Sequence, residues 1–461
     1  VDDYFKKLAD HFVMVDQEER RKVIREQVEK LAISHGGTAE IDEELLEEVV
    51  FLVEYPTALC GTFDKAYLAL PAEAIVTPMR EHQRYFPVRA KDKSLLPVFI
   101  TVRNGNADHL EIVQHGNERV LRARLDDAKF FFEEDQKVTL ANRVDRLKTI
   151  VFQDGLGTLY DKTLRVQRLA GQIAGKLGQG SDTCAIVERS ALLAKADLVT
   201  GMVYEFTELQ GIMGRQYALL NGEKPPVAQA IYEHYLPRFS GDELPQSDAG
   251  RIVSIADKID NIVATFSRGL IPTGSQDPYA LRRQSLGIVH ILIDGTYHLP
   301  LQGLLEDTLN LLQITDGARR EKLIAEVQDF FRLRIKNVLA DAGIRYDLID
   351  SVLTSGTDDI YDTWLRANAV AANAAANELQ LAAQAFTRIA NLTKNSTDTG
   401  STINPALFAN PAEQALHQTY DAVREKVVAA AGAKRYDEVL NSLFALIAPI
   451  DAFFSEVMVM V

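Results

Sequence analysis

The stretch Lys195–Tyr217 combines an apolar helical face with carboxylates, and this combination constrains the fold more than any other part of the sequence. Apolar residues recur there at the three- and four-residue spacing of one helical face, namely Leu198, Val199, Met202, Val203, Phe206 and Leu209. Asp197 and Glu208 lie close to that face, and Gly211 breaks the pattern. Because an unpartnered buried carboxylate is costly, we expect a core helix whose acids are satisfied by neighbouring helices or by a bound ion.

The length and composition predict several folded domains. At 461 residues the chain exceeds a usual single core, so we expect three or four domains. Hydrophobic residues make up 47% of the chain and charged residues 25%, which is typical of a globular protein. No uninterrupted apolar run approaches the roughly 20 residues that span a bilayer, so we expect a soluble protein without membrane contact.

The net charge, the cysteine content and the two ends of the sequence further restrict the class of protein. The formal net charge of −15 repels polyanions, so any contact with a nucleic acid must come from local basic patches. Cys60 and Cys184 are too few for a disulfide framework or a four-thiolate zinc site, which fits a reducing cytoplasm. The chain begins at Val1 and stops inside the apolar run Val457–Val461, so we expect a piece of a longer protein that lacks both ends.

Residues 1–148 are expected to form an α+β domain with leading helices. Helical spacing covers Glu18–Leu31 and Asp42–Tyr55. Short β-branched or aromatic runs, punctuated by Pro, Asp and Gly, predict strands at residues 74–78, 84–89 and 96–103. Lys91–Ser94 is expected to be the turn between two of these strands.

A long helix is expected over Glu118–Asp135, and its charges run against the helix dipole. Arg119 and Arg122 stand early in it, whereas acidic residues stand at its end. Each such charge is unfavourable by roughly 0.3 to 1 kcal/mol. We therefore expect these arginines to be solvated, to be held by tertiary partners, or to face an anion.

The remainder of the chain is almost entirely helical in period. Helices are expected over residues 162–177, 183–209, 226–235, 250–266 and 280–294. Residues 149–300 should form one helical domain, 301–362 a helical linker and 363–461 a C-terminal bundle. In that bundle an alanine-rich run predicts one long helix over Trp364–Lys394, followed by a polar loop at 395–401. The expected fold class is mainly α and multidomain.

The turn cluster Pro272–Pro278 and the glycines near residue 155 are the two loop signals with a clear mechanism. Ser275 or Asp277 can cap the helix that follows the turn cluster. Gly155 and Gly157 supply only the first two glycines of a dinucleotide-binding fingerprint, so we expect a plain tight turn there. With no G-x-x-x-x-G-K-[ST], H-E-x-x-H or C-x-x-C motif either, we expect no cofactor and no catalytic residue on this chain.

The best metal constellation in the sequence is Asp197, His234 and Asp257, which could hold a hard cation from neighbouring helices. Their order and spacing resemble the HD metal-dependent phosphohydrolase fold. Ala196, however, stands where the histidine of the His-Asp doublet belongs, and no histidine lies between His115 and His234. A site with so few ligands is expected to survive only as a degenerate scaffold without metal.

Six motifs in order resemble the β subunit of bacterial glycyl-tRNA synthetase over essentially the whole chain. They are Thr77–Val88, Phe99–Gly105, Gly116–Arg124, Ala196–Thr200, Glu205–Gly214 and Pro272–Pro278. Two further segments, Arg388–Asn391 and Pro449–Val459, resemble the helical anticodon-binding domain of that family. The resemblance implies an α+β domain, an HD-like helical domain and a C-terminal anticodon-binding-like bundle that is truncated here.

The same resemblance implies a function and partners. It implies a heterotetrameric ligase, held together through its α subunits or through contacts between β subunits. In it a separate α subunit carries the class II site for glycine and ATP with magnesium, and the β subunit contributes recognition of tRNA(Gly). This chain alone is then expected to be inactive. Two alternatives stay open, an HD-type phosphohydrolase, which Ala196 disfavours, and a pure scaffold without tRNA contact.

Two clusters join Arg119 and Arg122 as candidates for tRNA contact. Arg388, Asn391 and Lys394 follow one another at three-residue steps and could line one helix face, although basic residues near a helix end also favour its dipole. The second cluster lies between the expected strands and comprises Arg80, His82, Gln83 and Arg84. It could bind the acceptor stem or the α subunit, or it could anchor the α+β domain through buried hydrogen bonds.

Overall fold

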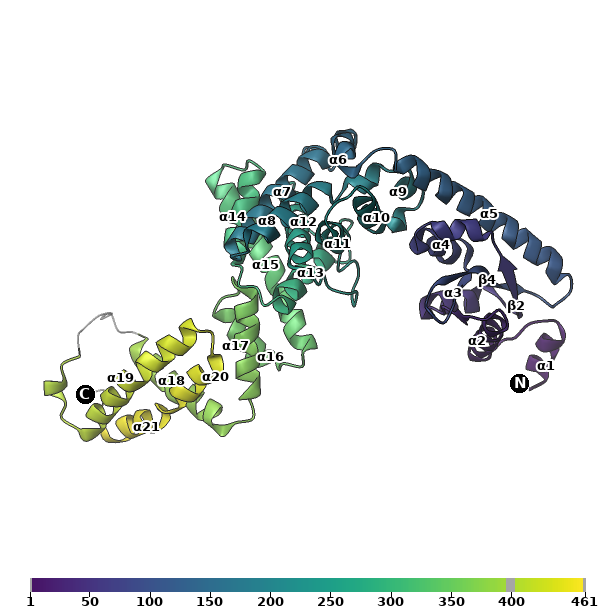
Figure 1. Cartoon of the computed structure of the whole chain (residues 1–461). Helices are drawn as coiled ribbons and strands as arrows, with labels where there is room; N and C mark the ends of the chain where they lie inside the picture. The colour runs from purple at the N-terminus through teal and green to yellow at the C-terminus, as the bar shows by residue number, and fades with distance from the viewer. Residues whose placement is uncertain (1, 395–402, 459–461) are drawn as a thin grey trace. The chain divides into compact units, whose positions relative to one another are not determined.

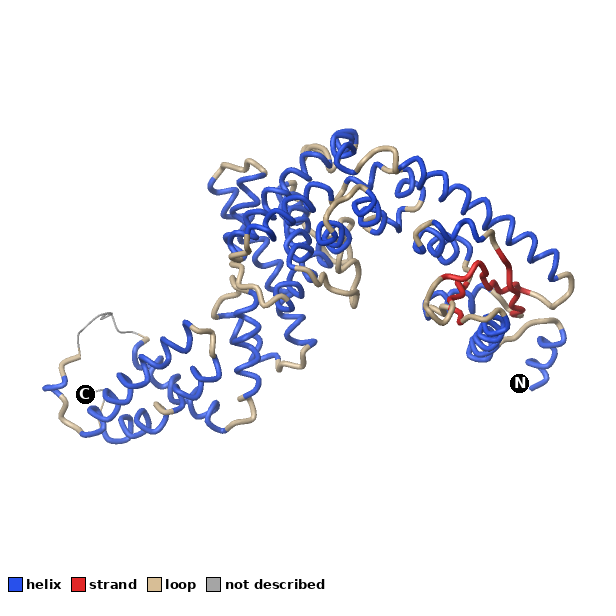
Figure 2. The backbone as a smooth tube through the Cα atoms, viewed as in Figure 1, coloured by secondary structure: helices blue, strands red, loops and turns tan. Residues whose placement is uncertain are grey.

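The computed structural model describes residues 2–394 and 403–458, and it divides into two compact units. The first unit contains the chain up to residue 171 together with residues 180–236 and 245–254. The second contains residues 172–179, 237–244 and the chain from 255 onward. Helices dominate both units, and the strands gather in one small region of the first (Figure 2). The expectation of a mainly α fold with a small N-terminal sheet is confirmed.

A four-stranded antiparallel sheet organises the N-terminal part of the first unit. Its strands, in the order β1-β3-β4-β2, are β1 (Thr38–Ala39), β3 (Phe86–Arg89), β4 (Leu95–Asn104) and β2 (Pro56–Thr62). The helices α2 (Gln17–Ser34) and α3 (Glu43–Leu52) share a core with it, made by Ile24, Val28, Leu46, Val50, Phe86, Val88 and Ile100. Asp16 and Asp42 cap the two helices by accepting from backbone amides of their first turns.

The segment at residues 74–78, expected to be a strand, is a helix. Ala72–Thr77 forms α4, and Pro78–His82 continues it as a single π-helical turn, η2. Pro71 stands at the N-cap, and helix-forming Ala and Glu residues fill the first turn. Ala74, Ile75 and Val76 are all buried, so the tertiary core and the first turn together outweigh the β-branched character of the segment.

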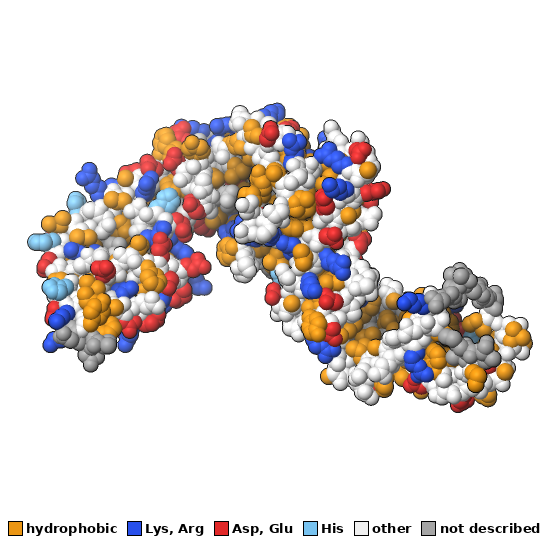
Figure 3. Space-filling view, turned by 180° about the vertical axis from the view of Figure 1, so that it is seen from behind, with side chains coloured by type: hydrophobic (Ala, Val, Ile, Leu, Met, Phe, Trp, Pro, Cys, Tyr) orange, Lys and Arg blue, Asp and Glu red, His pale blue; other side chains and the backbone are white. Residues whose placement is uncertain are grey.

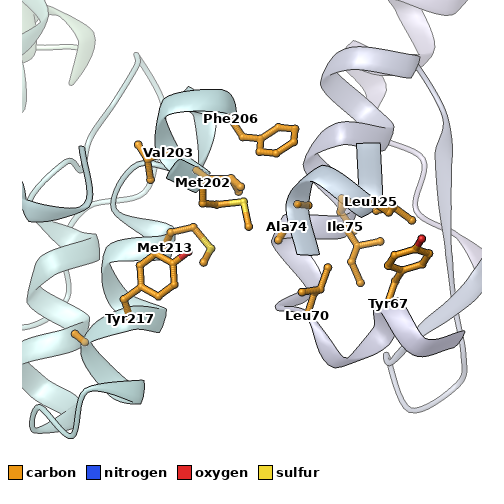
Figure 4. Close-up of a cluster of buried hydrophobic side chains, with 14 of the residues drawn as sticks. Tyr67, Leu70, Ala74, Ile75, Leu125, Met202, Val203, Phe206, Met213 and Tyr217 are labelled. Carbon is orange, nitrogen blue, oxygen red and sulfur yellow. The ribbon is translucent and has the colours of Figure 1, made fainter. Parts of the chain in front are cut away.

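A second apolar cluster joins the sheet region to the helices that follow it in the first unit. The 26-residue helix α5 (Leu110–Asp135), expected from the sequence as a shorter helix, contributes Leu121, Leu125 and Ala128 to it. In Figure 4 side chains of Tyr67, Leu70, Ala74, Ile75 and Leu125 face those of Met202, Val203, Phe206, Met213 and Tyr217. The cluster therefore buries the apolar residues that the stretch Lys195–Tyr217 was expected to place in a core.

That stretch is not one helix. It contains η4 (Ala196–Val199), α9 (Gly201–Glu205), η5 (Thr207–Leu209) and α10 (Ile212–Leu220). Thr200 adopts an extended backbone and its Oγ1 accepts from the Val203 amide, so a new helix begins there. Gly211 has a φ of 77°, which stops any continuation into α10. The helix expected over residues 183–209 accordingly ends at Leu193, where α8 (Ser181–Leu193) stops.

The remaining helices complete the two units (Figure 1). In chain order they are α1 (Asp2–Asp10), η1 (Lys65–Ala69), α6 (Leu140–Arg143), η3 (Val144–Thr149), α7 (Leu159–Lys176), α11 (Pro225–Glu233), α12 (Asp248–Ser267), α13 (Leu281–Asp294), α14 (Leu301–Leu311), α15 (Gly317–Asp341), α16 (Tyr346–Thr354) and α17 (Ile360–Ala372). Asp277 caps α13 through the amides of Leu281 and Arg282, as the turn cluster predicted.

The last four helices form a bundle around a small core. They are α18 (Asn377–Thr393), α19 (Pro411–Gly432), α20 (Tyr436–Phe444) and α21 (Ile447–Glu456), with the short turn η6 (Pro405–Leu407) before α19. Their shared core contains Ala385, Val423, Leu446 and Ile450. Helix Trp364–Lys394, expected as one piece, is broken, since α17 ends at Ala372 and α18 begins at Asn377. The loop expected at 395–401 lies outside the described residues.

A buried carboxylate attaches this bundle to α17. Asp362 is 8% exposed and accepts from Lys434 Nζ at 2.7 Å, from Arg366 Nε at 2.9 Å and from the Tyr436 hydroxyl. Although burial alone would raise it, these three partners hold the pKa of Asp362 below its ordinary value. The Asp362 carboxylate is therefore neutralised by cations, and through Lys434 it links the start of α17 to the loop between α19 and α20.

One stretch of the described chain, Tyr436–Glu456, is long and apolar enough to cross a membrane by length and composition. Its mean hydropathy is 1.4 and 11% of it is buried. The sequence analysis found no such run because charged residues interrupt it. In the structure it is divided into α20 and α21, which pack with α18 and α19.

Candidate functional site

The candidates on α18 are exposed, and one of them is held by the bundle. Arg388 donates to Asp451 at 2.8 Å, and its guanidinium lies 4.3 Å from the centre of the Phe454 ring. Asn391 is exposed on the same helix, and Lys394 is exposed at its C-cap. The expected row of polar groups thus exists, with its first member already engaged by an acid and an aromatic ring of α21. Contact of this row with tRNA stays a prediction.

The second cluster is matched by acids of the sheet region. Arg80 Nη2 lies 2.6 Å from Asp42 Oδ2, and Arg84 Nε lies 2.6 Å from Glu48 Oε1. Burial would raise the pKa of Asp42, but the amides that it caps and the Arg80 guanidinium hold that pKa below its ordinary value. This geometry fits the anchoring role that the sequence left open for Arg80 and Arg84.

The neighbours of those arginines have different surroundings. His82 is exposed, with its ring centre 5.7 Å from that of Phe206. Its Nε2 atom lies 3.9 Å from a carboxylate oxygen of Glu208, so the pair is an ion pair only when the imidazole is protonated. Gln83 is half-buried beside them. The four polar residues of this cluster therefore do not present one common basic face.

The arginines of α5 are exposed, and within the described residues none of them forms an ion pair. Arg119, Arg122 and Arg124 lie on the solvent side of the helix, among exposed apolar residues such as Val120 and Phe130. Among the expected alternatives, an ion pair with a tertiary partner is not seen in the described part of the chain. Solvation and contact with an anion remain the two interpretations.

A buried polar cluster at the end of α5 was missed by sequence reasoning. Asp135, 5% exposed, accepts from the amides of Gly201 and Met202 at 2.9 Å each and from the Tyr217 hydroxyl at 3.0 Å. Arg143 Nη2 donates to the Asp135 carbonyl at 2.7 Å and to its carboxylate at 3.2 Å. The sequence signal that could have revealed this cluster was an acidic residue at the C-terminus of a helix, where the helix dipole disfavours it. The cluster ties α5 to the start of α9.

Asp197, the first residue of the degenerate metal constellation, lies completely buried. Its Oδ2 accepts from the Gly211 amide at 2.6 Å, whereas Oδ1 has no hydrogen-bond partner among the described residues. Burial raises the pKa of this carboxyl to about 6. A Cβ at position 214 would lie 2.9 Å from Asp197 Oδ2, so Gly214 allows the close approach. The carboxylate thus holds the turn before α10, as expected for one satisfied by neighbours, although only in part.

The other two members of the constellation are buried as well. His234 is fully buried, with Nδ1 2.6 Å from the Ile231 carbonyl, so this nitrogen carries the proton. Asp257 is 6% exposed on α12. Ala196, at the position of the missing histidine, is fully buried too. Within residues 2–394 and 403–458 no group of three or more His, Cys, Asp or Glu side chains is placed to hold a metal ion.

The partial glycine motif is a turn. Gly155 and Gly157 have φ values of 72° and 81°, and a Cβ at Gly157 would meet Asp161 Oδ2 at 2.6 Å. That carboxylate instead accepts from the amide and hydroxyl of Thr158 at 2.8 and 2.7 Å. The glycines therefore serve a capping turn at the start of α7 rather than a phosphate cradle.

The comparison with known proteins agrees with the resemblance. The sequence model of the family described as glycyl-tRNA synthetase beta subunit matches residues 1–354. Curated relatives named glycine–tRNA ligase beta subunit match the whole chain: that of Desulforamulus reducens is 48% identical over 462 residues and that of Desulforudis audaxviator 47% over 459. The protein of Clostridioides difficile is 45% identical over 460 residues.

The chain spans 66% of the length of each of these relatives. The family match covers every element from α1 to α16, including the sheet, the long helix α5 and the helices around Asp197. The relatives extend the similarity across the C-terminal bundle as well. On these grounds the chain belongs to the glycyl-tRNA synthetase β-subunit family.

Proposed function

We propose that this chain supplies tRNA recognition and subunit assembly to a glycine–tRNA ligase, together with a separate α subunit that carries the site for glycine and ATP with magnesium. Membership of the β-subunit family is the observation that carries the proposal. The sequence offers no standard phosphate-binding motif of its own, which agrees with a catalytic site on another polypeptide. The expected assembly is a heterotetramer in the cytoplasm, held through α subunits or through contacts between β subunits.

The HD-like region serves this proposal as a structural domain rather than as a hydrolase. One carboxylate oxygen of Asp197 accepts a hydrogen bond from the Gly211 amide, and Ala196 stands where a metal-binding histidine would be expected. A metal-dependent hydrolase needs several ligands around an open coordination position. Substituting Ala196→His is therefore expected to create no metal-dependent phosphatase activity. Metal-dependent turnover of nucleotides by that variant would revive the hydrolase alternative.

The tRNA contact is assigned to exposed basic groups. Arg119 and Arg122 of α5 and Asn391 and Lys394 of α18 offer side chains that phosphate oxygens could reach. Arg388, Arg80 and Arg84 already engage acids, so their contribution requires exchange of partners. A pure scaffold without tRNA contact predicts no salt-dependent binding of tRNA, because phosphate contacts make affinity fall steeply as salt rises.

Reconstitution tests the proposal. The purified α subunit is combined with the full-length β subunit, with this chain, or with neither, and glycylation of tRNA(Gly) is measured in the presence of ATP, magnesium and glycine. We expect charging with the full-length β subunit and none with this chain alone. Charging by this chain without the α subunit would contradict the division of labour. An α subunit that charges tRNA equally well with or without β would contradict the role in recognition.

A further inference from the structure

The bundle α18–α21 has an apolar core of its own and a short covalent connection to the helices before it. Within the described residues, every member of that core lies between Ala385 and Phe454, and none comes from α17 or an earlier element. Residues 373–376 alone connect α17 to α18. The bundle can therefore fold around its own core, and its orientation depends on the contacts that it makes outside that core.

On the other side of this connector, α17 is fixed to the helices that precede it. It packs against α13, α15 and α16, and it buries Ile360, Thr363 and Ala367. Its N-cap Asp359 has a carboxylate oxygen 2.8 Å from His298 Nδ1, which attaches the start of the helix to the segment before α14. The helix is therefore a rigid part of the second unit, against which the bundle is held.

The apolar contact between α17 and the bundle is incomplete. Helix α20, which packs against α17, lies wholly within the described residues, and none of its side chains is buried. A groove of about 390 Å³ is bordered by Val352 and Ala369 on one side and by Val439 and Leu440 of α20 on the other. Val439 and Leu440 stay half-buried there. Burial of apolar surface therefore contributes little to holding the bundle against α17.

Asp362 supplies the buried polar contact at this junction. Basic and acidic side chains are interspersed across the face shown in Figure 3, so an exposed ion pair by itself marks no special contact. Asp362, by contrast, is 8% exposed, and it accepts from Lys434 and Tyr436 of the bundle as well as from Arg366 of its own helix. Breaking such a contact is unfavourable, because it leaves a buried carboxylate with fewer partners.

Lys434 stands at a position where a helix end often has glycine. At the end of α19 the amides of Lys434 and Arg435 donate to the carbonyls of Ala431 and Ala430, at 3.0 and 2.9 Å. Lys434 has a φ of 59°, a left-handed conformation that strains a residue with a Cβ. Glycine takes the equivalent position after α10 and α15, although threonine and glutamine take it after α13 and α14. The local backbone thus favours glycine, whereas the ion pair with Asp362 requires the lysine.

We propose that residues 373–376 are a hinge and that Asp362, Lys434 and Tyr436 form a latch, which holds the bundle against α17 and lets it swing away when it opens. Opening exchanges the two bundle contacts of Asp362 for water and leaves both α17 and the core of the bundle intact. The latch thereby sets the orientation of the polar row on α18 relative to the helices before it. The device is independent of the proposed function, because it needs only contacts within the second unit.

The test removes the Lys434 side chain and relieves its backbone strain in one step. Lys434→Gly deletes the ammonium group of the latch but places glycine in a left-handed conformation, so the end of α19 should stay formed. Lys93→Gly is the matched control. Lys93 has a φ of 68° in an exposed turn, and within the described residues it forms no ion pair. A role of Lys434 in the local turn alone predicts the same behaviour for both variants.

Limited proteolysis of the full chain with elastase measures opening, because this protease cleaves after small residues and the connector contains three alanines. Cleavage follows the population of the open form, and loss of a hydrogen bond to a charged group should raise that population about tenfold. We therefore expect the connector of Lys434→Gly to be cut about tenfold faster than that of the unmodified chain, with the bundle released as an intact fragment. Lys93→Gly should be cut at the unmodified rate.

An unchanged rate for Lys434→Gly, or an equal acceleration for Lys93→Gly, would overturn the latch. Cleavage spread through α18–α21 instead of at the connector would show that the bundle unfolds rather than swings, and it would overturn the hinge. Tyr436→Phe removes only a hydroxyl and is the second variant if Lys434→Gly fails to fold. Its connector should be cut about threefold faster, and an unchanged rate would again contradict the latch.

Discussion

Arginines in the sheet region and arginines on α5 differ in what surrounds them. Arg80 and Arg84 point at Asp42 and Glu48, and each pair ties a loop to α3. Arg119 and Arg122 are exposed, and neither forms an ion pair within the described residues. The comparison teaches that a basic cluster in a sequence predicts a binding surface only when the fold leaves its charges unmatched.

The largest expected effect comes from the most deeply matched charge. Replacing Arg143→Met would leave the carboxylate of Asp135 buried and without its cation. Breaking a buried ion pair by removing one partner costs about 3 to 5 kcal/mol of unfolding free energy. Urea denaturation monitored by circular dichroism measures this loss. The double variant Arg143→Met/Asp135→Asn is the control, because it removes both charges and keeps an oxygen that can accept from the Gly201 or Met202 amide. A single variant as stable as the unmodified chain would show that the pair is not a stabilising element.

The unfolding free energy should depend on pH through Asp197, a buried acid with a hydrogen bond to only one of its two oxygens within the described residues. Burial raises the pKa of Asp197 to about 6, so the folded state holds the proton more tightly than the unfolded state does. This contribution to stability is therefore present below the unfolded pKa near 4 and is lost as pH rises through about 6.

The Asp197→Asn variant isolates that contribution because it cannot ionise. The full shift corresponds to about 3 kcal/mol, so between pH 4 and pH 7 the unmodified chain should lose up to that much stability relative to the variant. Unfolding free energies from urea titrations at both pH values give the difference. Parallel pH profiles for the two proteins would mean that folding does not raise the pKa of this carboxyl, contrary to expectation.

Intermediate effects should separate the two arginine clusters directly. Arg80→Gln leaves Asp42 partly buried with one charged partner fewer, and we expect the unfolding free energy to fall by about 1 to 2 kcal/mol. Arg124→Gln removes an exposed charge of α5 that forms no ion pair within the described residues, and it should change stability by less than about 0.5 kcal/mol in either direction. Thermal unfolding of both variants compares them. Equal losses would erase the distinction between matched and unmatched arginines.

The smallest effect on stability is expected on α5. Arg119→Gln/Arg122→Gln removes two exposed charges that oppose the helix dipole, so stability should stay constant or rise by about 0.5 kcal/mol. If α5 faces an anion, tRNA affinity falls while stability does not. On the same preparation, calorimetry measures the stability and filter binding measures the tRNA affinity. A clear loss of stability would indicate a tertiary partner outside the described residues.

Much of the fold followed from local pattern, because local chemistry decided it. The turn Lys91–Ser94 joins β3 and β4 as predicted, and Asp277 caps α13. The pattern failed where side-chain hydrogen bonds or the core decided instead. Thr200 starts a new helix inside Lys195–Tyr217, and the alanine-rich run divides between Ala372 and Asn377. Hydrophobic periodicity does not record such capping events, since a capped break can preserve the apolar face.

The candidate sites were harder to predict than the fold. Sequence spacing could place Arg388, Asn391 and Lys394 on one face, but it could not show that Asp451 lies opposite Arg388, because the two are 63 residues apart. For the same reason the contact between Tyr436 and Asp362, which are 74 residues apart, was not visible. Pairing across helices depends on tertiary packing, and a single sequence gives no direct signal of it.

The junction at Asp362 also constrains how this chain can vary. Three side chains from separate positions, Arg366, Lys434 and Tyr436, all converge on that one carboxylate. Exchange of Asp362 for an apolar residue would strand two cations and a hydroxyl at once, so an accepted change there requires compensating changes at its partners. The four positions are therefore energetically coupled, and we expect them to covary among homologues even where the surrounding helix surfaces diverge.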